Sequence, residues 1–173
     1  AKSRLWVGTF GQGAYYAAVA PGPMRDWSWQ HWTSALESRD RQVWAFAEGA
    51  NGDMYLGSDA GITRLRPDGR VDRIDLDSGE MDTLRSLLPA SDGNLYASTV
   101  GGVYRIDPAT LEATRFSSAQ GLTDMRVYAL AEWPRGHLLI GTWSGLFSMP
   151  LDGTAVTPHL LTFKGENYAP RLV

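Results

Sequence analysis

The chain has 173 residues, of which 43% are hydrophobic and 20% are charged, and its formal net charge is −3. Such a composition suits an ordinary globular domain that builds a core, and without a basic excess it gives no reason to expect binding to nucleic acid. The sequence contains no cysteine, which excludes disulfides and thiol chemistry, and its longest apolar run, residues 14–20, is far too short to span a bilayer.

The first expected elements, in residues 4–19, are two short apolar runs on either side of the glycine-rich stretch TFGQG, and they indicate two adjacent strands. Farther on, Trp27 and Trp29 alternate with polar residues, so we expect the outermost strand of this first unit there. Together with Trp32, these side chains are expected to pack rather than to form an exposed aromatic patch for binding.

A complete unit follows in residues 43–76. The runs VWAFAE, MYLGS, ITRLRP and VDRIDL have the length expected for strands, and turn sequences such as GANGD and DGR separate them. Asn-Gly is the strongest short signal for a hairpin. The unit therefore predicts a four-stranded antiparallel meander whose first strands are buried on both faces and whose fourth strand is the most polar.

The same template recurs in residues 84–110 and 127–153. When the copies are aligned on the small residue after their central apolar triplet, the anchors are Gly8, Gly57, Ser98 and Gly141, at spacings of 49, 41 and 43 residues. A period in the low forties with several short strands is typical of β-propellers. The predicted fold is thus all-β: a β-propeller array of about four four-stranded antiparallel blades, either complete or part of a larger propeller.

We expect residues 1–173 to form a single propeller segment. The first unit lacks a recognisable inner strand, so the free side of residues 5–9 should be covered by residues 170–173, by a second molecule, or by further blades of a longer propeller. Residues 170–173 make only a short strand, so a homodimer or a longer chain is favoured. The expected blade units are 1–36 (incomplete), 37–78, 79–120 and 121–163, with the start of a further strand in 164–173.

Aromatic residues at repeat-equivalent positions are expected to pack between blades. Trp6, Tyr55 and Tyr96 occupy the same place in the second strand of their units, where the fourth copy has Leu139. A large ring repeated at one position of a blade is more often part of the packing than a platform for a ligand.

Residues suited to catalysis or metal binding do not form a recognisable set. His31, His137 and His159 share neither a spacing nor a position in the repeat. The acidic stretch 71–82 does not place glycine at the sixth position of a calcium loop, so a solvated loop is favoured over a calcium site. No nucleophile, phosphate-loop or dinucleotide motif is present. The sequence therefore predicts no catalytic residue, no metal, no cofactor and no enzyme activity.

A ligand site is expected where the loops between second and third strands meet the connectors between blades, because in a propeller both lie on one face near the central channel. An aromatic side chain with a few polar groups around a concave mouth is what a small ligand requires. The alternative is that these are ordinary loop residues. The candidate residues are Phe10, Gln12, Asp59 and Trp143 from the loops, and Arg41, Met125 and Arg126 from the connectors.

Several stretches carry a family resemblance. RFSSAQGLTDMRVYALAE (115–132) followed by LLIGTWSGLFSMPLDG (138–153) resembles the two-component-regulator propeller repeat, with its Gly-Leu loop, its V-x-x-L-x-E strand and its Gly-Thr motif. LWVGT (5–9) and NLYASTVGGVYRID (94–107) are similar to parts of it. Two copies depart from the pattern: Ser98 replaces the glycine of the triplet, and no Gly-Leu pair precedes Val43.

The resemblance implies a sensing role. Such repeats form the extracytoplasmic, often periplasmic, input domains of bacterial receptors whose output is a histidine kinase, a diguanylate cyclase or a DNA-binding module. It implies that this chain is part of a longer receptor, reaches the membrane only through a segment outside this sequence, and binds a small molecule, a glycan fragment or a protein partner. The alternatives are a protein-interaction scaffold without a small ligand and a propeller lyase or hydrolase.

Overall fold

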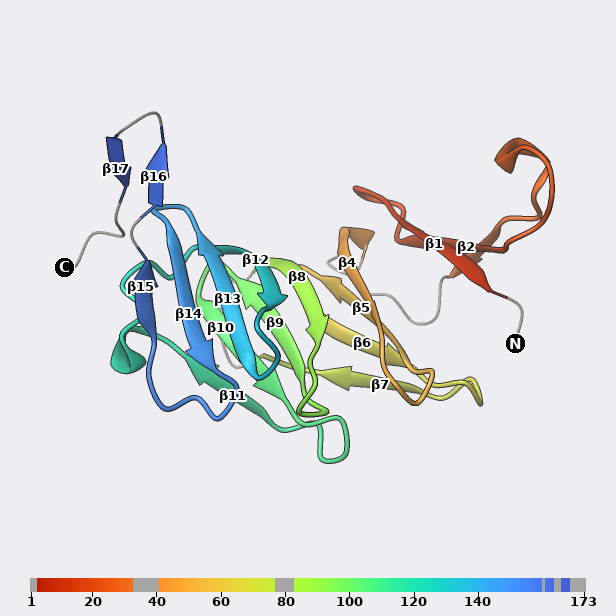
Figure 1. Cartoon of the computed structure of the whole chain (residues 1–173). Coiled ribbons are helices and arrows are strands. Elements are labelled where there is room, and N and C mark those ends of the chain that lie inside the picture. Colours follow the sequence, from red (N-terminus) through yellow and green to blue (C-terminus); the bar gives the residue numbers. More distant parts are fainter. Residues whose placement is uncertain (1–2, 33–40, 77–82, 160, 164–165, 169–173) are drawn as a thin grey trace.

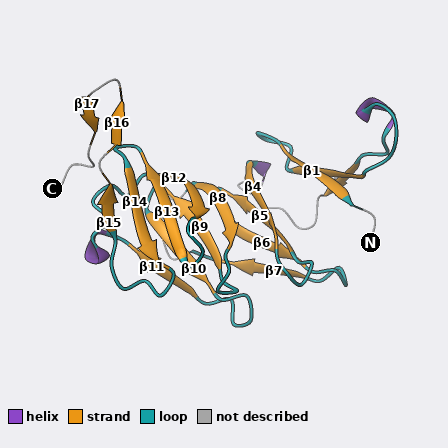
Figure 2. Cartoon of the chain, in the orientation of Figure 1, coloured by secondary structure: helices purple, strands orange, loops and turns teal. Residues whose placement is uncertain are grey.

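The computed structural model describes residues 3–32, 41–76, 83–159, 161–163 and 166–168. In these residues the chain is almost entirely β-structure, with two short 3-10 turns, η1 (Met24–Asp26) and η3 (Ser118–Gln120). Figure 2 shows the strands standing in successive sheets joined by loops. No helix in the described part is long and apolar enough to cross a membrane.

The strands form one three-stranded sheet, three four-stranded sheets and a separate hairpin (Figure 1). The first sheet contains β1 (Arg4–Gly8), β2 (Ala14–Ala18) and β3 (Gln30–Trp32). The second contains β4 (Val43–Glu48), β5 (Met54–Ser58), β6 (Gly61–Leu65) and β7 (Val71–Ile74), and the third β8 (Leu84–Pro89), β9 (Leu95–Thr99), β10 (Gly102–Ile106) and β11 (Ala113–Phe116). The fourth contains β12 (Val127–Glu132), β13 (His137–Thr142), β14 (Leu146–Pro150) and β15 (Thr157–His159), and the hairpin β16 (Leu161–Phe163) and β17 (Glu166–Tyr168).

The predicted fold class is confirmed. Within each blade, hydrogen-bonded neighbours follow one another in sequence and run antiparallel, as in β4-β5-β6-β7. The turns have the expected chemistry: Gly52 after Asn51 and Gly69 after Asp68 adopt φ of 81° and 87°, a region that a side chain disfavours. The chain is therefore a propeller-like array of antiparallel blades.

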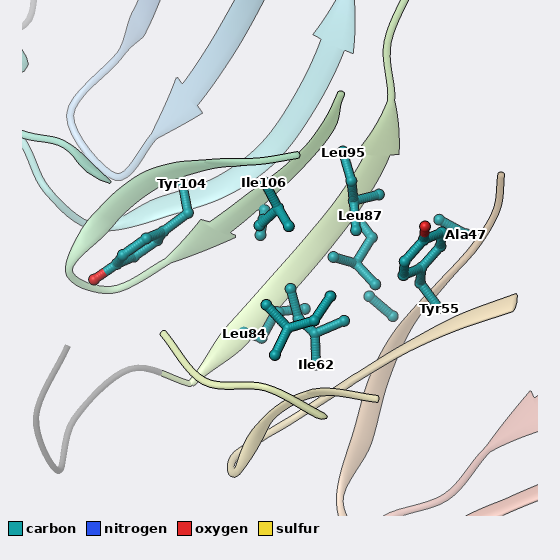
Figure 3. Packing of buried hydrophobic residues seen from close by; sticks show 11 residues of the cluster. Ala47, Tyr55, Ile62, Leu84, Leu87, Leu95, Tyr104 and Ile106 are labelled. Carbon is teal, nitrogen blue, oxygen red and sulfur yellow. The ribbon is translucent and has the colours of Figure 1, made fainter. Parts of the chain in front are cut away.

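Burial follows the position of a strand within its blade. All five residues of β9 are buried, whereas in β11, the outermost strand of the same sheet, only Phe116 is. The blades bury their apolar faces against one another rather than around a centre of their own. One cluster between the second and third sheets includes Tyr55, Ile62, Leu84 and Ile106 (Figure 3). A second cluster joins the third and fourth sheets.

Two aromatic positions expected between blades are fully buried. Tyr55 is 1% exposed and Tyr96 is 0% exposed. Trp6 is only partly buried and packs against Tyr16 and Phe46, with ring centroids 4.7 and 6.0 Å away. The alignment of the repeats therefore identifies the packing positions of the second strands.

Polar groups also join one blade to the next. In the second blade, the buried guanidinium of Arg64 pairs with Asp53 and donates a 2.7 Å hydrogen bond from Nη1 to the carbonyl of Pro108 in the third. The Tyr96 hydroxyl likewise donates to the carbonyl of Leu151 in the fourth, at 3.0 Å. Both acceptors, Pro108 and Leu151, lie just after the third strand of the blade that follows the donor's blade. Arg64 and Tyr96 therefore make equivalent hydrogen bonds between successive blades, although they are different residues.

The first sheet differs from one expectation. Its outermost strand is Gln30–Trp32, not the segment around Trp27 and Trp29. Those two rings stack on each other 6.2 Å apart in the preceding loop, because η1 turns the chain and Trp29 Nε1 bonds back to the carbonyl of Met24 at 3.1 Å. Trp32 is buried against the second sheet, as expected.

The strand β1 pairs with β2, and no strand in the described part pairs with its other side. The residues proposed to cover it, 170–173, lie outside the described residues. The expected unit boundaries stay predictions.

The small anchor residues of the repeat, such as Gly8 and Gly141, allow a test of how closely the backbones of neighbouring strands approach. A Cβ at Gly8 would lie 2.5 Å from the carbonyl oxygen of Val43, whereas a Cβ at Gly141 would meet nothing nearer than 3.6 Å. We expect Gly8→Ala to lower the free energy of unfolding by about 1–3 kcal/mol, because the two backbones must separate. Gly141→Ala, the matched control, should change it by no more than about 0.5 kcal/mol. Denaturant unfolding followed by tryptophan fluorescence measures both, and equal effects would contradict this account of the glycine.

Candidate functional site

The loops between second and third strands gather at one end of the blades. In each of the three complete blades the start of the inner strand pairs with the end of the second strand, as Val43 does with Ser58, so this loop lies beside the start of the inner strand. A hydroxyl holds each loop by accepting from a loop N–H and donating to a glycine carbonyl at 2.9–3.4 Å. These hydroxyl residues are Thr9, Ser58, Thr99 and Thr142, each directly after the small anchor residue.

Each complete blade has a β-bulge at the same place in its inner strand. The register shifts between residues 43 and 45 in β4, between 84 and 86 in β8, and between 127 and 129 in β12. The extra residues are Trp44, Arg85 and Tyr128. A bulge leaves one residue out of the ladder of hydrogen bonds and redirects its side chain. Three equivalent positions therefore present a large side chain at the loop end of the blades.

Two of the bulge residues are exposed and Arg85 is half-buried, although the residue before each of them is buried. Val43, Leu84 and Val127 are at most 8% exposed, whereas Trp44 is 39% exposed and Tyr128 is 43% exposed. Packing of the blades thus uses the residue before the bulge and leaves the bulge residue free for contacts outside the core.

The three bulge residues touch in a row, because the inner strands β4, β8 and β12 lie next to one another (Figure 1). The guanidinium carbon of Arg85 lies 5.1 Å from the ring centroid of Trp44 and 5.9 Å from that of Tyr128. Such distances are in the range of cation–π attraction. We call Trp44, Arg85 and Tyr128 the bulge row.

Loop residues extend the bulge row at both ends. The ring of Phe10 meets Trp44 edge-on at 5.7 Å, and Trp143 lies 6.1 Å from Tyr128. Phe10 and Trp143 are 76% and 69% exposed, which is unusual for such large apolar side chains. Together the five side chains form a line of aromatic faces with one arginine at its centre.

Two carboxylates hold this line in place. Asp59 accepts a 2.7 Å hydrogen bond from Trp44 Nε1. Asp124 accepts from Arg126 Nε at 3.1 Å and from the Ser144 backbone at 2.8 Å, and the guanidinium of Arg126 lies 5.7 Å from the Trp143 ring. Burial alone would raise the pKa of Asp124, but the hydrogen bonds from Arg126 and Ser144 outweigh it and hold that pKa below its ordinary value.

Four of the candidate residues come together here. Phe10, Asp59, Arg126 and Trp143 all contact the bulge row or its extension. The remaining three do not join them through their side chains.

Gln12, Arg41 and Met125 have other contacts. The carbonyl of Gln12 lies 2.6 Å from His31 Nε2, and the carbonyl of Arg41 accepts from Gly11 and Gly13 at 2.9 Å each. Met125 is partly buried against the core of the third and fourth sheets.

Sequence reasoning missed the bulge row itself. Trp44, Arg85 and Tyr128 stand at the second position of three strands that were expected to be buried on both faces. The available signal was that this aligned position holds a tryptophan, an arginine and a tyrosine, whereas the position before it is always valine or leucine.

Two of the histidines make contacts outside the bulge row. His31 stacks on Tyr15 at 4.5 Å and His159 Nε2 lies 2.6 Å from the Ser148 hydroxyl. No group of three or more metal-ligating side chains occurs among the residues that the structure describes. Half of the acidic segment considered for calcium, residues 77–82 of 71–82, falls outside them.

A shallow cavity lies at the opposite end of the second and third blades. Gly49, Asn51, Tyr55, Ala90 and Gly93 are among its lining residues, and these belong mainly to the turns between first and second strands. It offers neither a charged side chain nor an exposed ring, so we place the candidate site on the bulge row instead.

Comparison with known proteins gives the fold and no family. No family model matches the chain, and no curated protein matches it. Among solved structures it is similar to the extracellular domain of BT4673 from B. thetaiotaomicron, which is named as a hybrid two component system, with a TM-score of 0.70 and 17% identity over 92% of this chain and 25% of that one. The corresponding domain of BT3049 gives a TM-score of 0.66 and 18% identity, over 91% of this chain and 22% of that one.

The chain is also similar to an enzyme, with a TM-score close to those of the extracellular domains. The chain matches virginiamycin B lyase from Staphylococcus aureus with a TM-score of 0.69 and 14% identity, over 90% of this chain and 50% of the lyase. At such identities the likeness establishes a propeller-like fold alone. The chain spans about a quarter of the length of the receptor domains that it matches.

The link between Asp124, Arg126 and Ser144 gives a prediction about pH. A carboxylate with a depressed pKa stabilises the fold above its ordinary pKa, and this stability is lost as the pH falls through the folded value. We expect Asp124→Asn to lower the free energy of unfolding by about 1–3 kcal/mol at pH 7. The difference from the unchanged protein should shrink below a pH of about 4.

Chemical unfolding at a series of pH values measures this difference. The exposed Glu112, replaced by Gln, is the control and should change stability by less than about 0.5 kcal/mol at any of them. An Asp124→Asn effect that is independent of pH would show that the ionised carboxylate is not what stabilises the loop.

Proposed function

We propose that this chain is a ligand- or partner-sensing propeller segment from the extracytoplasmic part of a bacterial signalling receptor of the two-component-regulator propeller family. The observation that carries the proposal is the line of exposed aromatic rings around Arg85, at the end of the blades where the loops meet. A soluble protein rarely exposes so many contiguous large rings unless they bind something.

The comparisons support the signalling context. Two of the similar structures are extracellular domains named as parts of hybrid two component systems. The repeat motifs of the sequence point the same way, from the Gly-Leu loop at residues 121–122 to the Gly-Thr motif at 141–142. In this proposal the segment binds without catalysing a reaction, and the chemistry of the response belongs to another part of the receptor.

A panel of defined compounds tests the binding role: maltose, cellobiose, glucose, sodium glucuronate and sodium benzoate. We expect saturable binding of at least one compound by calorimetry, lost when Trp44→Ala and Trp143→Ala are combined, because both changes remove a ring against which a ligand packs. The compound should be recovered unchanged.

The matched control for this experiment is Trp29→Ala, which removes a tryptophan that stacks on Trp27 in the loop before β3 and, among the described residues, makes no ring contact with the bulge row. It should leave binding within about twofold of the unchanged protein. Binding of no compound in the panel, or binding that survives the double substitution, would contradict the proposal. Conversion of a bound compound into product would contradict its non-catalytic part.

A second copy of the chain is the proposed protein partner. The strand β1 is paired on one side only in the described part, and its apolar residues Leu5 and Val7 are 37% and 40% exposed. Unpaired strand edges of this kind associate with other strands.

We expect light scattering to show a mass that rises toward twice the monomer mass with concentration. Val7→Lys should abolish the rise, because a lysine on an edge strand opposes pairing. A monomer at every concentration would rule out this partner.

A further inference from the structure

We infer that the bulge row is a receptor for a planar carboxylate, with Arg85 as the residue that binds the carboxylate and the flanking rings as the surface for the rest of the ligand. The inference rests on the proposed function and names the chemical class of ligand for the same site.

The first step is the unusual state of Arg85. Its side chain is half-buried, and its Nε is enclosed without a hydrogen-bond partner. No carboxylate pairs with it in the part of the chain that the structure describes, whereas the site's other arginine, Arg126, is paired with Asp124. A carboxylate from outside would reach the terminal nitrogens of the guanidinium, which are not enclosed as Nε is. Because no partner within the described residues occupies them, a group that supplies an acceptor is favoured there.

The second step is that the site's own carboxylates are already engaged. Asp59 accepts from Trp44 Nε1, and Asp124 accepts from Arg126 and Ser144. Each of these bonds orients a member of the line, and neither carboxylate forms an ion pair with Arg85. The positive charge at the centre of the line is therefore available to an anion from outside.

The third step concerns the shape of the anion. The rings of Trp44 and Tyr128, one from each neighbouring blade, have their centroids 5.1 and 5.9 Å from the guanidinium carbon of Arg85. A planar carboxylate can receive two parallel N–H bonds from the edge of a guanidinium while staying in its plane. A tetrahedral anion must point oxygens toward the neighbouring rings, whose faces carry partial negative charge. The arrangement thus favours a carboxylate over a phosphate or sulfate.

The fourth step is the position of Arg85 among the blades. The aromatic bulge residues lie in the second and fourth blades and the arginine lies between them in the third. A ligand with its carboxylate on Arg85 meets Trp44 and Phe10 on one side and Tyr128 and Trp143 on the other. Flat apolar groups on either side of the carboxylate, such as sugar or aromatic rings, would contact these faces.

Calorimetric titration of the unchanged chain with two carboxylates and their neutral analogues tests the inference: sodium benzoate against benzamide, and sodium glucuronate against glucose. We expect at least one carboxylate to bind with a Kd of about 1 mM or lower, and its neutral analogue to bind at least about tenfold more weakly. Phenyl phosphate, the tetrahedral anion, should bind more weakly than benzoate. The two carboxylates distinguish an aromatic acid from a sugar acid as the source of the group.

Substitution then assigns the effect to Arg85. Arg85→Met keeps the apolar stem and should weaken carboxylate binding at least about tenfold, while Arg85→Lys should recover only part of it, since a lysine forms no bidentate pair. The matched control is Arg4→Met, because Arg4 lies 5.2 Å from the Tyr16 ring in the first sheet, outside the bulge row. Circular dichroism checks that all three variants are folded.

The results separate this inference from the proposed function. If maltose, cellobiose or glucose binds through Trp44 and Trp143 and Arg85→Met leaves all binding unchanged, the sensing role stands and the carboxylate site is wrong. The inference is also overturned if neither carboxylate shows saturable binding, if phenyl phosphate binds more tightly than benzoate, or if Arg4→Met weakens binding as much as Arg85→Met.

Discussion

Among the described residues the blades have no cores of their own, and each of the first three blades buries its apolar residues against the next one. A single four-stranded sheet has two faces and no interior, so its side chains leave water only where another sheet covers them. The cluster that contains Tyr55 and Leu84 is shared by the second and third sheets, and the one that contains Tyr96 and Phe147 is shared by the third and fourth. The hydrogen bonds from Arg64 to Pro108 and from Tyr96 to Leu151 follow the same rule.

This dependence on neighbours also explains why the candidate site lies where it does. Face-to-face packing brings β4, β8 and β12 close together, and the bulge in each strand then turns one side chain per blade toward the same end. The site is therefore a product of the array rather than of any one blade. A ligand that spans Trp44, Arg85 and Tyr128 contacts three blades at once, so its binding energy favours one arrangement of those blades over others.

Much of the fold was predictable from the sequence, because it depends on patterns that are local and repeated. Turn pairs such as Asn51-Gly52 identify the hairpins, and the alignment that places Tyr55 and Tyr96 at one position identifies residues that are both fully buried. The outermost strand of the first sheet was misplaced onto Trp27 and Trp29. Alternation of aromatic and polar residues does not distinguish a strand from a loop in which two rings stack on each other.

The residues of the candidate site were predictable only in part, because those in loops follow from the topology whereas those at bulges do not. Phe10, Asp59, Arg126 and Trp143 stand in loops or connectors whose location follows from the topology, so the sequence could place them at this end of the blades; their role in binding stays a prediction. The bulge residues stand in strands, and a bulge leaves no clear mark in a short apolar sequence because it changes the register by a single residue. Whether Arg85 faces a neighbouring blade or the solvent depends on that shift, which only the arrangement of β8 against β9 reveals.

The bulge also allows a side chain in a strand to change without disturbing the pairing of that strand with its neighbour. In a regular β-strand, exchanging a side chain disturbs the neighbours across the sheet, whereas a bulged residue has no partner opposite it in the ladder. Trp44, Arg85 and Tyr128 differ in size, charge and shape, yet the residues immediately before them, Val43, Leu84 and Val127, all pack in the core. The scaffold thus provides one position in each of the three complete blades whose side chain can change while the surrounding architecture stays the same.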